Sequence, residues 1–340
     1  MSKKTSLKDI ARHLGVSTAL VSYVINGKEK QARVGPEMVK KIRRAVIELN
    51  YQPNLIAKSL KSGKTKTIGL IVADISNPFF SAIARIIEDE ARKSGYVVIF
   101  GSSDESAEKS QELINVFLNR QVDAFIIAAA ENTEDQILGL QRSGIPVVLI
   151  DRYFPRVPSD TVCINNTEIS KKAVTHLIDG GCRHIALLTY KTTLAHINDR
   201  TEGYKQALKA GGLKAGKKMI REASYQDIEK DVEKQMLDLF NKKQKVDGIF
   251  FATNSLAVLG LKIINKLGIQ VPSELAIVSF DQSDAFDFFY APLSYVSQCL
   301  NQLGKEALEL LVKRLHQKTR PKADGFQSVT VEAKLVVRDS

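Results

Sequence analysis

Residues 5–27 read TSLKDIARHLGVSTALVSYVING, and this stretch decides how the first part of the chain folds. Apolar residues recur at the spacing i, i+3, i+4, i+7 across residues 7–14, which predicts a helix with one buried face. Gly15 is a natural helix stop, and Ser17 is a good N-cap for a second helix that ends near Asn26. Two short helices joined in this way are typical of a helix-turn-helix unit.

A third helix is predicted from Pro36, because proline suits the first helical position. Its apolar face is formed by Val39, Ile42, Val46 and Leu49. The remaining faces carry the basic residues Lys40, Lys41, Arg43 and Arg44. The N-terminal part is therefore expected to be an all-α helix-turn-helix domain over residues 1–50.

Positive charge is concentrated at the N-terminal end. Residues 1–64 contain 14 Lys and Arg against four Asp and Glu, so they carry ten of the eleven net positive charges of the 340-residue chain. Such a segment is usually the electrostatic footprint of a nucleic-acid binder. A solubilising basic tail is the alternative, but a tail would lack the apolar periodicity seen here.

The segment after residue 50 has the pattern of a hinge. The Pro53-Asn pair breaks the preceding helical pattern, residues 54–61 could form a short helix, and residues 62–64 look like linker. Eight residues are too few for a helix that is stable by itself in water, so another part of the molecule or a partner must hold it. We expect a hinge helix and linker over residues 51–64.

From residue 67 onward the pattern changes to apolar runs alternating with amphipathic helices, which predicts parallel sheets wrapped by helices. About 270 residues is long for one such sheet, so we expect an α/β body of two lobes over residues 65–340. The predicted strands are 67–73, 96–100, 123–128, 146–150, 184–189, 247–252 and 275–280. The predicted helices are 79–94, 106–119, 133–142, 167–180, 198–211, 227–243, 254–267 and 300–316.

Several classes of protein are disfavoured. Three scattered cysteines without a CxxC pair predict no zinc site and fit a reducing compartment. The lack of an apolar leader and of a long uncharged apolar stretch predicts a cytoplasmic protein with no membrane span. There is no GxGxxG after a strand, Walker loop, GxSxG or HExxH motif, and the five histidines are isolated, so we expect neither an enzyme nor a cofactor.

The sequence resembles the lactose/galactose repressor family of bacterial transcriptional regulators. The resemblance begins with residues 5–27 and ELNYQPNLIAKSLKSGKTKTIGLIV at 48–72, and continues through SNPFF at 76–80, DRTEGY at 199–204, ATNSLAVLG at 252–260 and SFDQS at 279–283. It implies a body with the periplasmic-binding-protein fold, a ligand in the cleft between two lobes, and a homodimer. The first lobe is expected at about 65–164 and 297–325, and the second at about 165–296 and 326–340.

The resemblance places the residues that contact DNA bases on the second helix, which enters the major groove. These residues are Thr18, Ala19 and Tyr23, and an ordinary exposed helix residue is the alternative for each. Where the family usually has Thr and Arg in this helix, the chain has Leu20 and Tyr23, so no operator sequence is carried over. Phosphate contacts are expected from Ser17, Ser22 and Asn26, although Ser17 could serve as an N-cap instead.

The hinge motif NxxAxxL corresponds to Asn54, Ala57 and Leu60. The resemblance implies that Leu60 inserts at a minor-groove base step and kinks the DNA, together with the same residue of a second chain. Asn54 and Ala57 are expected to contact phosphates. A Leu60 side chain that packs on the body is the alternative.

The effector site is expected at the carboxyl ends of strands, where ligands of open α/β folds bind. Aromatic faces with carboxylate, amide and guanidinium groups suit a polyhydroxyl ligand. Phe79 and Phe80 could instead belong to the core, and Asp281 and Arg200 could be an internal salt bridge. The residues that the resemblance assigns to the effector are Phe79, Phe80, Asp151, Arg200, Tyr225, Asn254, Asp281 and Gln298.

The predicted function is sequence-specific control of transcription, as a repressor whose operator binding responds to a small sugar or sugar phosphate. The expected partners are a pseudo-palindromic duplex and a second copy of the chain. The final residues VTVEAKLVVRDS alternate like a strand and carry no heptads, which favours a dimer over a tetramer. The alternative is a periplasmic-type sugar-binding protein without a DNA role, which the basic N-terminal helices disfavour.

Overall fold

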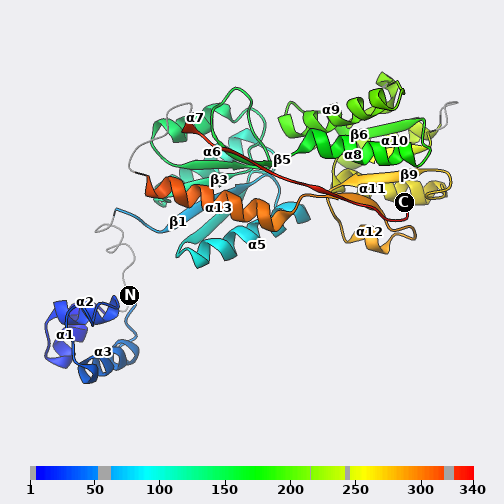
Figure 1. Ribbon diagram of the computed structural model, residues 1–340. Helices are drawn as coiled ribbons and strands as arrows, with labels where there is room; N and C mark the ends of the chain where they lie inside the picture. Colours follow the sequence, from blue (N-terminus) through cyan, green and yellow to red (C-terminus); the bar gives the residue numbers. More distant parts are fainter. Residues whose placement is uncertain (1–4, 53–62, 215, 242–245, 318–324) are drawn as a thin grey trace. The chain divides into compact units, whose positions relative to one another are not determined.

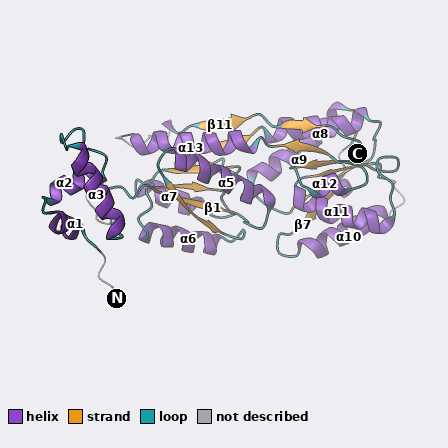
Figure 2. Ribbon diagram, turned by 90° about the horizontal axis from the view of Figure 1, so that it is seen from below, coloured by secondary structure: helices purple, strands orange, loops and turns teal. Residues whose placement is uncertain are grey.

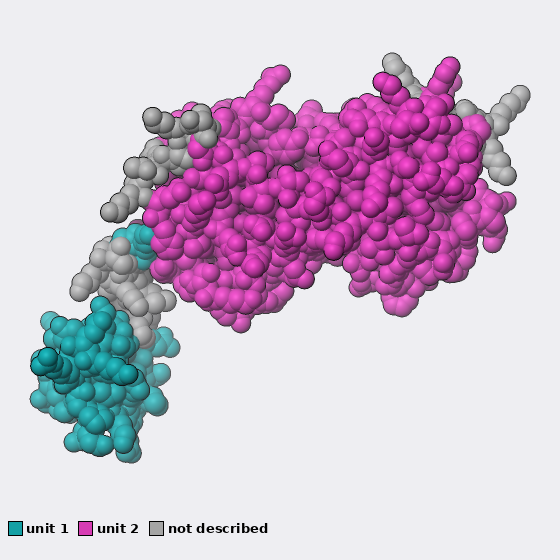
Figure 3. Space-filling model, in the orientation of Figure 1, with its two compact units in different colours: residues 1–65 teal, residues 66–340 magenta. Residues whose placement is uncertain are grey.

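A computed structural model describes residues 5–52, 63–214, 216–241, 246–317 and 325–340. The chain divides into two compact units, residues 1–65 and 66–340 (Figure 3). The proposed hinge helix, with Asn54, Ala57 and Leu60, lies outside the described residues.

The first unit contains the three predicted helices, α1 (Leu7–Leu14), α2 (Thr18–Ile25) and α3 (Pro36–Glu48). The hydroxyl of Ser6 caps α1, and Gly15 ends it with φ of 65°, a left-handed conformation that glycine adopts without strain. The helices enclose a small core of one apolar face from each, formed by Ile10, Ala11, Val21, Val24, Val39, Ile42 and Ala45.

The second unit contains two six-stranded sheets within its described residues, and the two sheets have equivalent strand orders. The first has the order β11-β5-β4-β3-β1-β2, and the second has the order β12-β10-β9-β8-β6-β7. Neighbouring strands in both sheets run parallel apart from the β10–β12 pair, which is antiparallel. The predicted two-lobed α/β body with parallel sheets is confirmed.

The first sheet comprises β1 (Thr67–Val72), β2 (Val97–Ser102), β3 (Ala124–Ile127), β4 (Val147–Ile150), β5 (Asp160–Ile164) and β11 (Ser328–Val331). It is flanked by α5 (Pro78–Lys93), α6 (Ala107–Asn119), α7 (Glu134–Arg142) and α13 (Leu300–His316). Figure 1 shows α13 running alongside α5. Strand residues alternate between faces, so Leu70 joins the core beneath α5 and α13 whereas Ile71 joins the core beneath α6 and α7.

The second sheet comprises β6 (Ile185–Tyr190), β7 (Ile220–Ala223), β8 (Gly248–Phe251), β9 (Ala276–Phe280), β10 (Ser294–Ser297) and β12 (Lys334–Val336). A short 3-10 helix, η1 (Lys217–Met219), precedes β7, and α12 (Ala285–Phe288) follows β9. The longer helices form two pairs on opposite faces of the sheet (Figure 2): α8 (Asn166–Asp179) with α9 (Ala195–Ala210), and α10 (Ile228–Phe240) with α11 (Asn254–Leu267). Within the described residues, no helix is both long and apolar enough to span a membrane.

The position at which the chain passes for the last time from the first lobe to the second differs from the expected one. We expected the chain to enter the second lobe at residue 326, but β11 pairs with β5 in the first sheet and only β12 joins the second. The alternating pattern that reads as one strand is two short edge strands separated by Glu332-Ala333. The side chain of Asn165 holds this crossing, because it donates to Glu332 at 2.7 Å and accepts from the Ala333 N–H at 3.0 Å.

Candidate DNA-reading helix and ligand cleft

Helix α2 presents a polar face away from the small core. Thr18 and Ala19 are exposed, the Tyr23 side chain is 45 % exposed, and Val21 and Val24 on the opposite side are buried. The three predicted base-contacting residues therefore share an accessible surface of one helix. A helix of this kind can enter a major groove with its first turns against base edges.

The predicted phosphate contacts lie at the two ends of α2. The Ser17 hydroxyl oxygen caps the helix by accepting the Leu20 N–H at 3.2 Å, so the N-cap reading is confirmed. A hydroxyl group that accepts one hydrogen bond can still donate its own proton, so Ser17 can cap the helix and also donate to a phosphate. Asn26 donates to the Ser22 carbonyl at 2.8 Å, which orders the other end.

Helix α3 adds exposed positive charge, part of which is paired within the unit. Lys40 pairs with Glu37, Arg43 pairs with Glu29 at 2.8 Å, and Arg44 pairs with Glu48. Exposed pairs such as these contribute little to stability, so their cations can exchange partners for phosphates at small cost.

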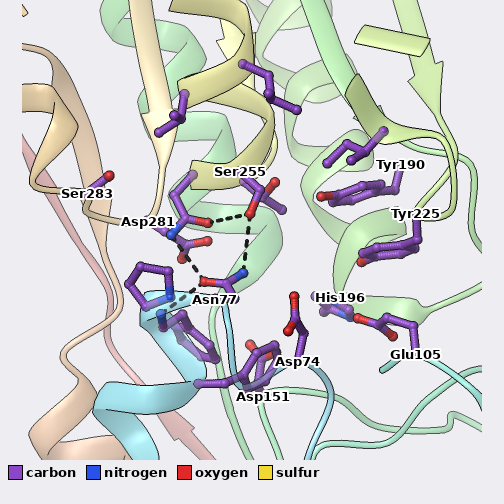
Figure 4. Close-up of a pocket in the computed structure, with 18 of the residues that line it drawn as sticks. Asp74, Asn77, Glu105, Asp151, Tyr190, His196, Tyr225, Ser255, Asp281 and Ser283 are labelled. Atoms are coloured by element: carbon purple, nitrogen blue, oxygen red, sulfur yellow. Dashed lines mark hydrogen bonds between the residues drawn. The ribbon is translucent and has the colours of Figure 1, made fainter. Parts of the chain in front are cut away.

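A cavity of about 460 Å³ lies between the two lobes of the second unit, at the carboxyl ends of strands from both sheets (Figure 4). The surface of this unit is indented between the lobes in Figure 3. A cavity of this size and position suits a small ligand. All eight residues expected to bind an effector line it: Phe79, Phe80, Asp151, Arg200, Tyr225, Asn254, Asp281 and Gln298.

Arg200 is fully buried at the centre of this lining. Its Nε donates to Asn166 Oδ1 and its Nη1 to the Ala252 carbonyl, both at 2.9 Å. Its guanidinium lies 3.6 Å from the centroid of the Phe280 ring. Arg200 forms an ion pair with Asp151 at 3.9 Å, and Asp281, the partner expected as an alternative, also stabilises its charge. Burial lowers the pKa of Arg200, and the neighbouring carboxylates oppose that shift.

Two buried carboxylates face Arg200 from the two lobes. Burial raises the pKa of Asp151 to about 6, because the nearby Arg200 and Arg152 only partly offset the loss of hydration. Burial also raises the pKa of Asp281, which accepts a hydrogen bond from the Gln298 amide. Both carboxyl groups are therefore easier to protonate than an exposed aspartate.

Aromatic side chains form the apolar walls of the cleft. Tyr190 and Tyr225 lie stacked in the cleft (Figure 4), and their ring centroids are 3.8 Å apart with an interplanar angle of 11°. Phe79 and Phe80 meet edge to face at 4.9 Å. Both phenylalanines are buried in the hydrophobic core and also line the cavity, so the two alternative predictions for them are compatible.

Polar contacts connect the two lobes around the cleft. Asn77, which caps α5, accepts from Asn254 at 3.3 Å and donates to Ser255 at 3.4 Å (Figure 4). Glu131 Oε1 accepts from the Thr192 and Thr193 hydroxyls and from the Thr193 N–H. These bonds join loops of the first sheet to helix starts of the second, and they define the spacing of the lobes in this state.

Sequence reasoning missed several lining residues. Arg152 donates to both oxygens of Glu105, at 2.6 and 2.7 Å, a buried fork-shaped pair that bridges distant segments. Tyr190 and His196 also line the cavity. The sequence contained a signal for two of these residues. Tyr190 comes directly after the predicted strand 184–189, and Arg152 comes directly after Asp151, so both lie at strand ends where ligand-binding residues are expected. Within the described residues, no cluster of three or more His, Cys, Asp or Glu could hold a metal ion.

Known proteins resemble both units. The profile described as "Bacterial regulatory proteins, lacI family" matches residues 6–54, and a "Periplasmic binding protein-like domain" matches residues 174–340. The chain is 30 % identical to the ribose operon repressor of Haemophilus influenzae over 98 % of each protein. It is 34 % identical to catabolite control protein A of Priestia megaterium over 92 % of this chain and 93 % of that protein.

Solved structures share the fold. The lac repressor dimer bound to operator and the anti-inducer ONPF aligns with a TM-score of 0.86 at 21 % identity, over 99 % of each chain. The complex of the transcriptional regulator CelR with cellobiose aligns with a TM-score of 0.73 at 24 % identity, over 99 % of this chain and 100 % of that one.

A helix-turn-helix unit joined to a two-lobed body with a ligand cleft defines the class of DNA-binding transcriptional regulators. The chain belongs to the LacI family of bacterial regulatory proteins.

Proposed function

We propose that this regulator is a repressor whose operator binding is controlled by a small sugar bound in the cleft between the lobes. The observation that carries the proposal is the 460 Å³ cavity, which brings eight residues from distant motifs to one place. Stacked tyrosines supply a flat apolar surface, and Asp151, Arg200 and Asp281 supply buried polar groups for hydroxyls. Relatives named for ribose and a structure named for cellobiose support a sugar ligand here.

The DNA end is proposed to act through α2. Thr18 and Ala19 suit contacts with a thymine methyl group, and Tyr23 can exchange one hydrogen bond with a base edge. Ser17, Ser22 and Asn26 are proposed to position the helix against phosphates. Asn54, Ala57 and Leu60 stay sequence-based proposals, and replacing Leu60 with alanine should reduce DNA bending in a bending assay.

The protein is further proposed to act as a homodimer, since a two-fold operator needs two reading heads. Apolar side chains on the second unit are available for such a contact. Val97 and Phe100, on the edge strand β2, are 65 % and 58 % exposed, and Phe288 on α12 is 87 % exposed. Light scattering of the full-length protein would measure its mass, and a monomer or a four-chain mass would contradict this part.

Coupling between the two units is proposed to run through the hinge. A sugar that changes the angle between the lobes would change the spacing of two hinge segments in a dimer, and with it the free energy of forming both hinge helices on DNA. Hydrogen exchange on residues 54–61, with and without operator, would test whether these residues gain protection on binding.

The decisive experiment is selection of operator sites from a random duplex pool, followed by fluorescence anisotropy. We expect a pseudo-palindromic site, an affinity that falls steeply as salt rises, and a further change when the correct sugar is added. Equal affinity for all sequences would contradict operator recognition. Operator binding that no sugar alters would contradict control through the cleft.

A further inference from the structure

The charges that line the cleft are unbalanced. Among the described lining residues, five carboxylates face only two guanidinium groups. The carboxylates are Asp74, Glu105, Asp151, Glu229 and Asp281, and the guanidinium groups are Arg152 and Arg200. An anionic ligand would therefore enter a cavity of the same sign as itself, in surroundings where burial weakens the screening of charge.

The Arg152 guanidinium is largely committed to protein acceptors. Its two Nη atoms donate to both carboxylate oxygens of Glu105, and Nη1 also donates to the Ala129 carbonyl at 3.0 Å. This arrangement uses the fork with which arginine would hold a phosphate. Arg152 is thereby neutralised by a partner of its own and leaves little charge for a ligand.

The Arg200 guanidinium is similarly occupied. Nε and Nη1 donate to Asn166 and to the Ala252 carbonyl, and the Phe280 ring covers one face at 3.6 Å. The remaining Nη2 lies 3.9 Å from Asp151 Oδ1. A phosphate that reached Nη2 would meet that carboxylate at the same point.

Two of the helix N-termini around the cleft, those of α5 and α11, hold side-chain acceptors already, whereas α9 and α10 have no side-chain cap among the described residues. Asn77 accepts the Phe79 N–H at the start of α5. At the start of α11, Thr253 accepts the Leu256 N–H, and the Asp281 carboxylate accepts the backbone hydrogen bond of Asn254. Just before α9, Glu131 accepts the Thr193 N–H.

Unpartnered polar atoms in the cleft are of both kinds. Among the described residues, Asp151 Oδ1 and Gln298 Oε1 are buried acceptors without a donor, and Arg152 Nε is a buried donor without an acceptor. A hydroxyl group can satisfy either kind, whereas an ionised phosphate only accepts and an ammonium only donates. Buried groups of both kinds therefore match a ligand rich in hydroxyls.

We infer that the effector is a polyhydroxyl compound without an anionic group, a free sugar and not a sugar phosphate or sugar acid. This inference rests on the proposed function and specifies the ligand class of the same cleft. The stacked Tyr190 and Tyr225 rings give such a ligand its apolar surface, and the unpartnered acceptors and donors give its hydroxyls their places.

The test titrates the full-length protein with matched pairs, in which a sugar is compared with its own phosphate ester. The probes are D-ribose with ribose 5-phosphate, D-glucose with glucose 6-phosphate, D-fructose with fructose 1-phosphate, and cellobiose with its 6-phosphate, followed by calorimetry and by thermal shift. In each pair that binds, we expect the free sugar to bind at least about tenfold more tightly, because the ester is repelled by uncompensated carboxylates. Added salt should narrow this gap only slightly, because mobile ions screen buried charges poorly.

A charge variant separates repulsion from shape. Glu229 is an exposed residue of the cavity lining, so Glu229→Gln should narrow the affinity gap between each ester and its free sugar by about twofold to fivefold. The matched control is Glu222→Gln, the same charge change on an exposed residue of β7 outside the lining, which should change neither affinity. If an ester binds more tightly than its free sugar, the inference about ligand charge is overturned, but the proposed function is not. If no member of any pair binds while operator binding persists, the sugar effector itself is refuted, and the inference with it.

Discussion

Asp151 and Asp281 occupy equivalent positions in the two lobes. Each is the first residue after the strand that stands third in the order of its sheet, β4 or β9, and each is held in the left-handed conformation, with φ of 66° and 67°. Aspartate tolerates this conformation better than most residues. The repeated fold therefore directs one carboxylate from each lobe toward the cleft, where both interact with Arg200.

The raised pKa of Asp151 predicts a pH-dependent stability. Its pKa is about 6 in the folded protein against an ordinary value of 3.8, so folding favours its protonated form. The destabilising effect of its charge is absent below about pH 4 and complete above its folded pKa. Compared with Asp151→Asn, the wild type should lose about 2 kcal/mol of unfolding free energy between pH 4 and pH 7. Urea unfolding at several pH values measures this difference, and a constant difference would contradict the raised pKa.

Replacing Arg200 should remove the effector response and spare DNA binding. Arg200→Ala leaves the Asn166 side-chain oxygen and the Ala252 carbonyl buried without their donor, which should cost about 2–5 kcal/mol of stability. Arg200→Lys keeps the charge and should fold more stably, with sugar affinity still reduced about tenfold or more. Anisotropy on operator, with and without sugar, is the measurement. An Arg200→Lys protein with a normal response would remove this residue from the site.

The contacts of Glu131 should favour the lobe spacing seen here. Glu131→Ala removes the acceptor shared by Thr192 and Thr193, so the lobes should separate more often in the absence of ligand. Small-angle scattering should then record a larger radius of gyration for residues 66–340. Glu134→Ala, which changes the same residue type on the exposed start of α7, is the control and should scatter like the wild type.

Gly203 should be irreplaceable for the packing of α9 on α8. A Cβ atom there would lie well inside contact distance of the Thr167 carbonyl oxygen, so Gly203→Ala should cost about 1–3 kcal/mol. Gly139, also within a helix, has open space around its Cα, and Gly139→Ala should be neutral or stabilising by up to about 1 kcal/mol. Thermal unfolding of both variants checks the contrast, and equal effects would argue against close helix packing as the cause.

Two variants of the first unit should separate sequence reading from charge. Tyr23→Ala should weaken operator binding by about 1–3 kcal/mol and leave non-specific binding nearly unchanged. Lys41→Ala removes an exposed charge on α3 and should weaken binding to all duplexes alike, with a salt slope lower by about one. Anisotropy on operator and on scrambled duplex measures both. A uniform loss with Tyr23→Ala would assign that residue to phosphate contact.

Much of the architecture follows from local sequence. The helix-turn-helix unit was predictable because its helices begin and end at Ser17, Gly15 and Pro36, residues whose backbone preferences act within one turn. The body was predictable because buried parallel strands need continuous apolar runs, and these match the observed strands closely. The short edge strands β7 and β11 were harder to find, since edge strands carry weaker patterns, and β5 was missed although it lies inside the first sheet.

The sequence by itself determined the class of the protein, the identity of its elements and the motifs that carry polar residues to strand ends. Only the tertiary structure decided which sheet β11 joins, that Arg200 pairs with Asp151, and that Arg152 is neutralised by Glu105. The physical reason is the distance along the chain over which each interaction acts. Caps and apolar periodicity act between near neighbours in the chain, whereas burial, ion pairing and the balance of charge in a cleft depend on residues that only the fold brings together.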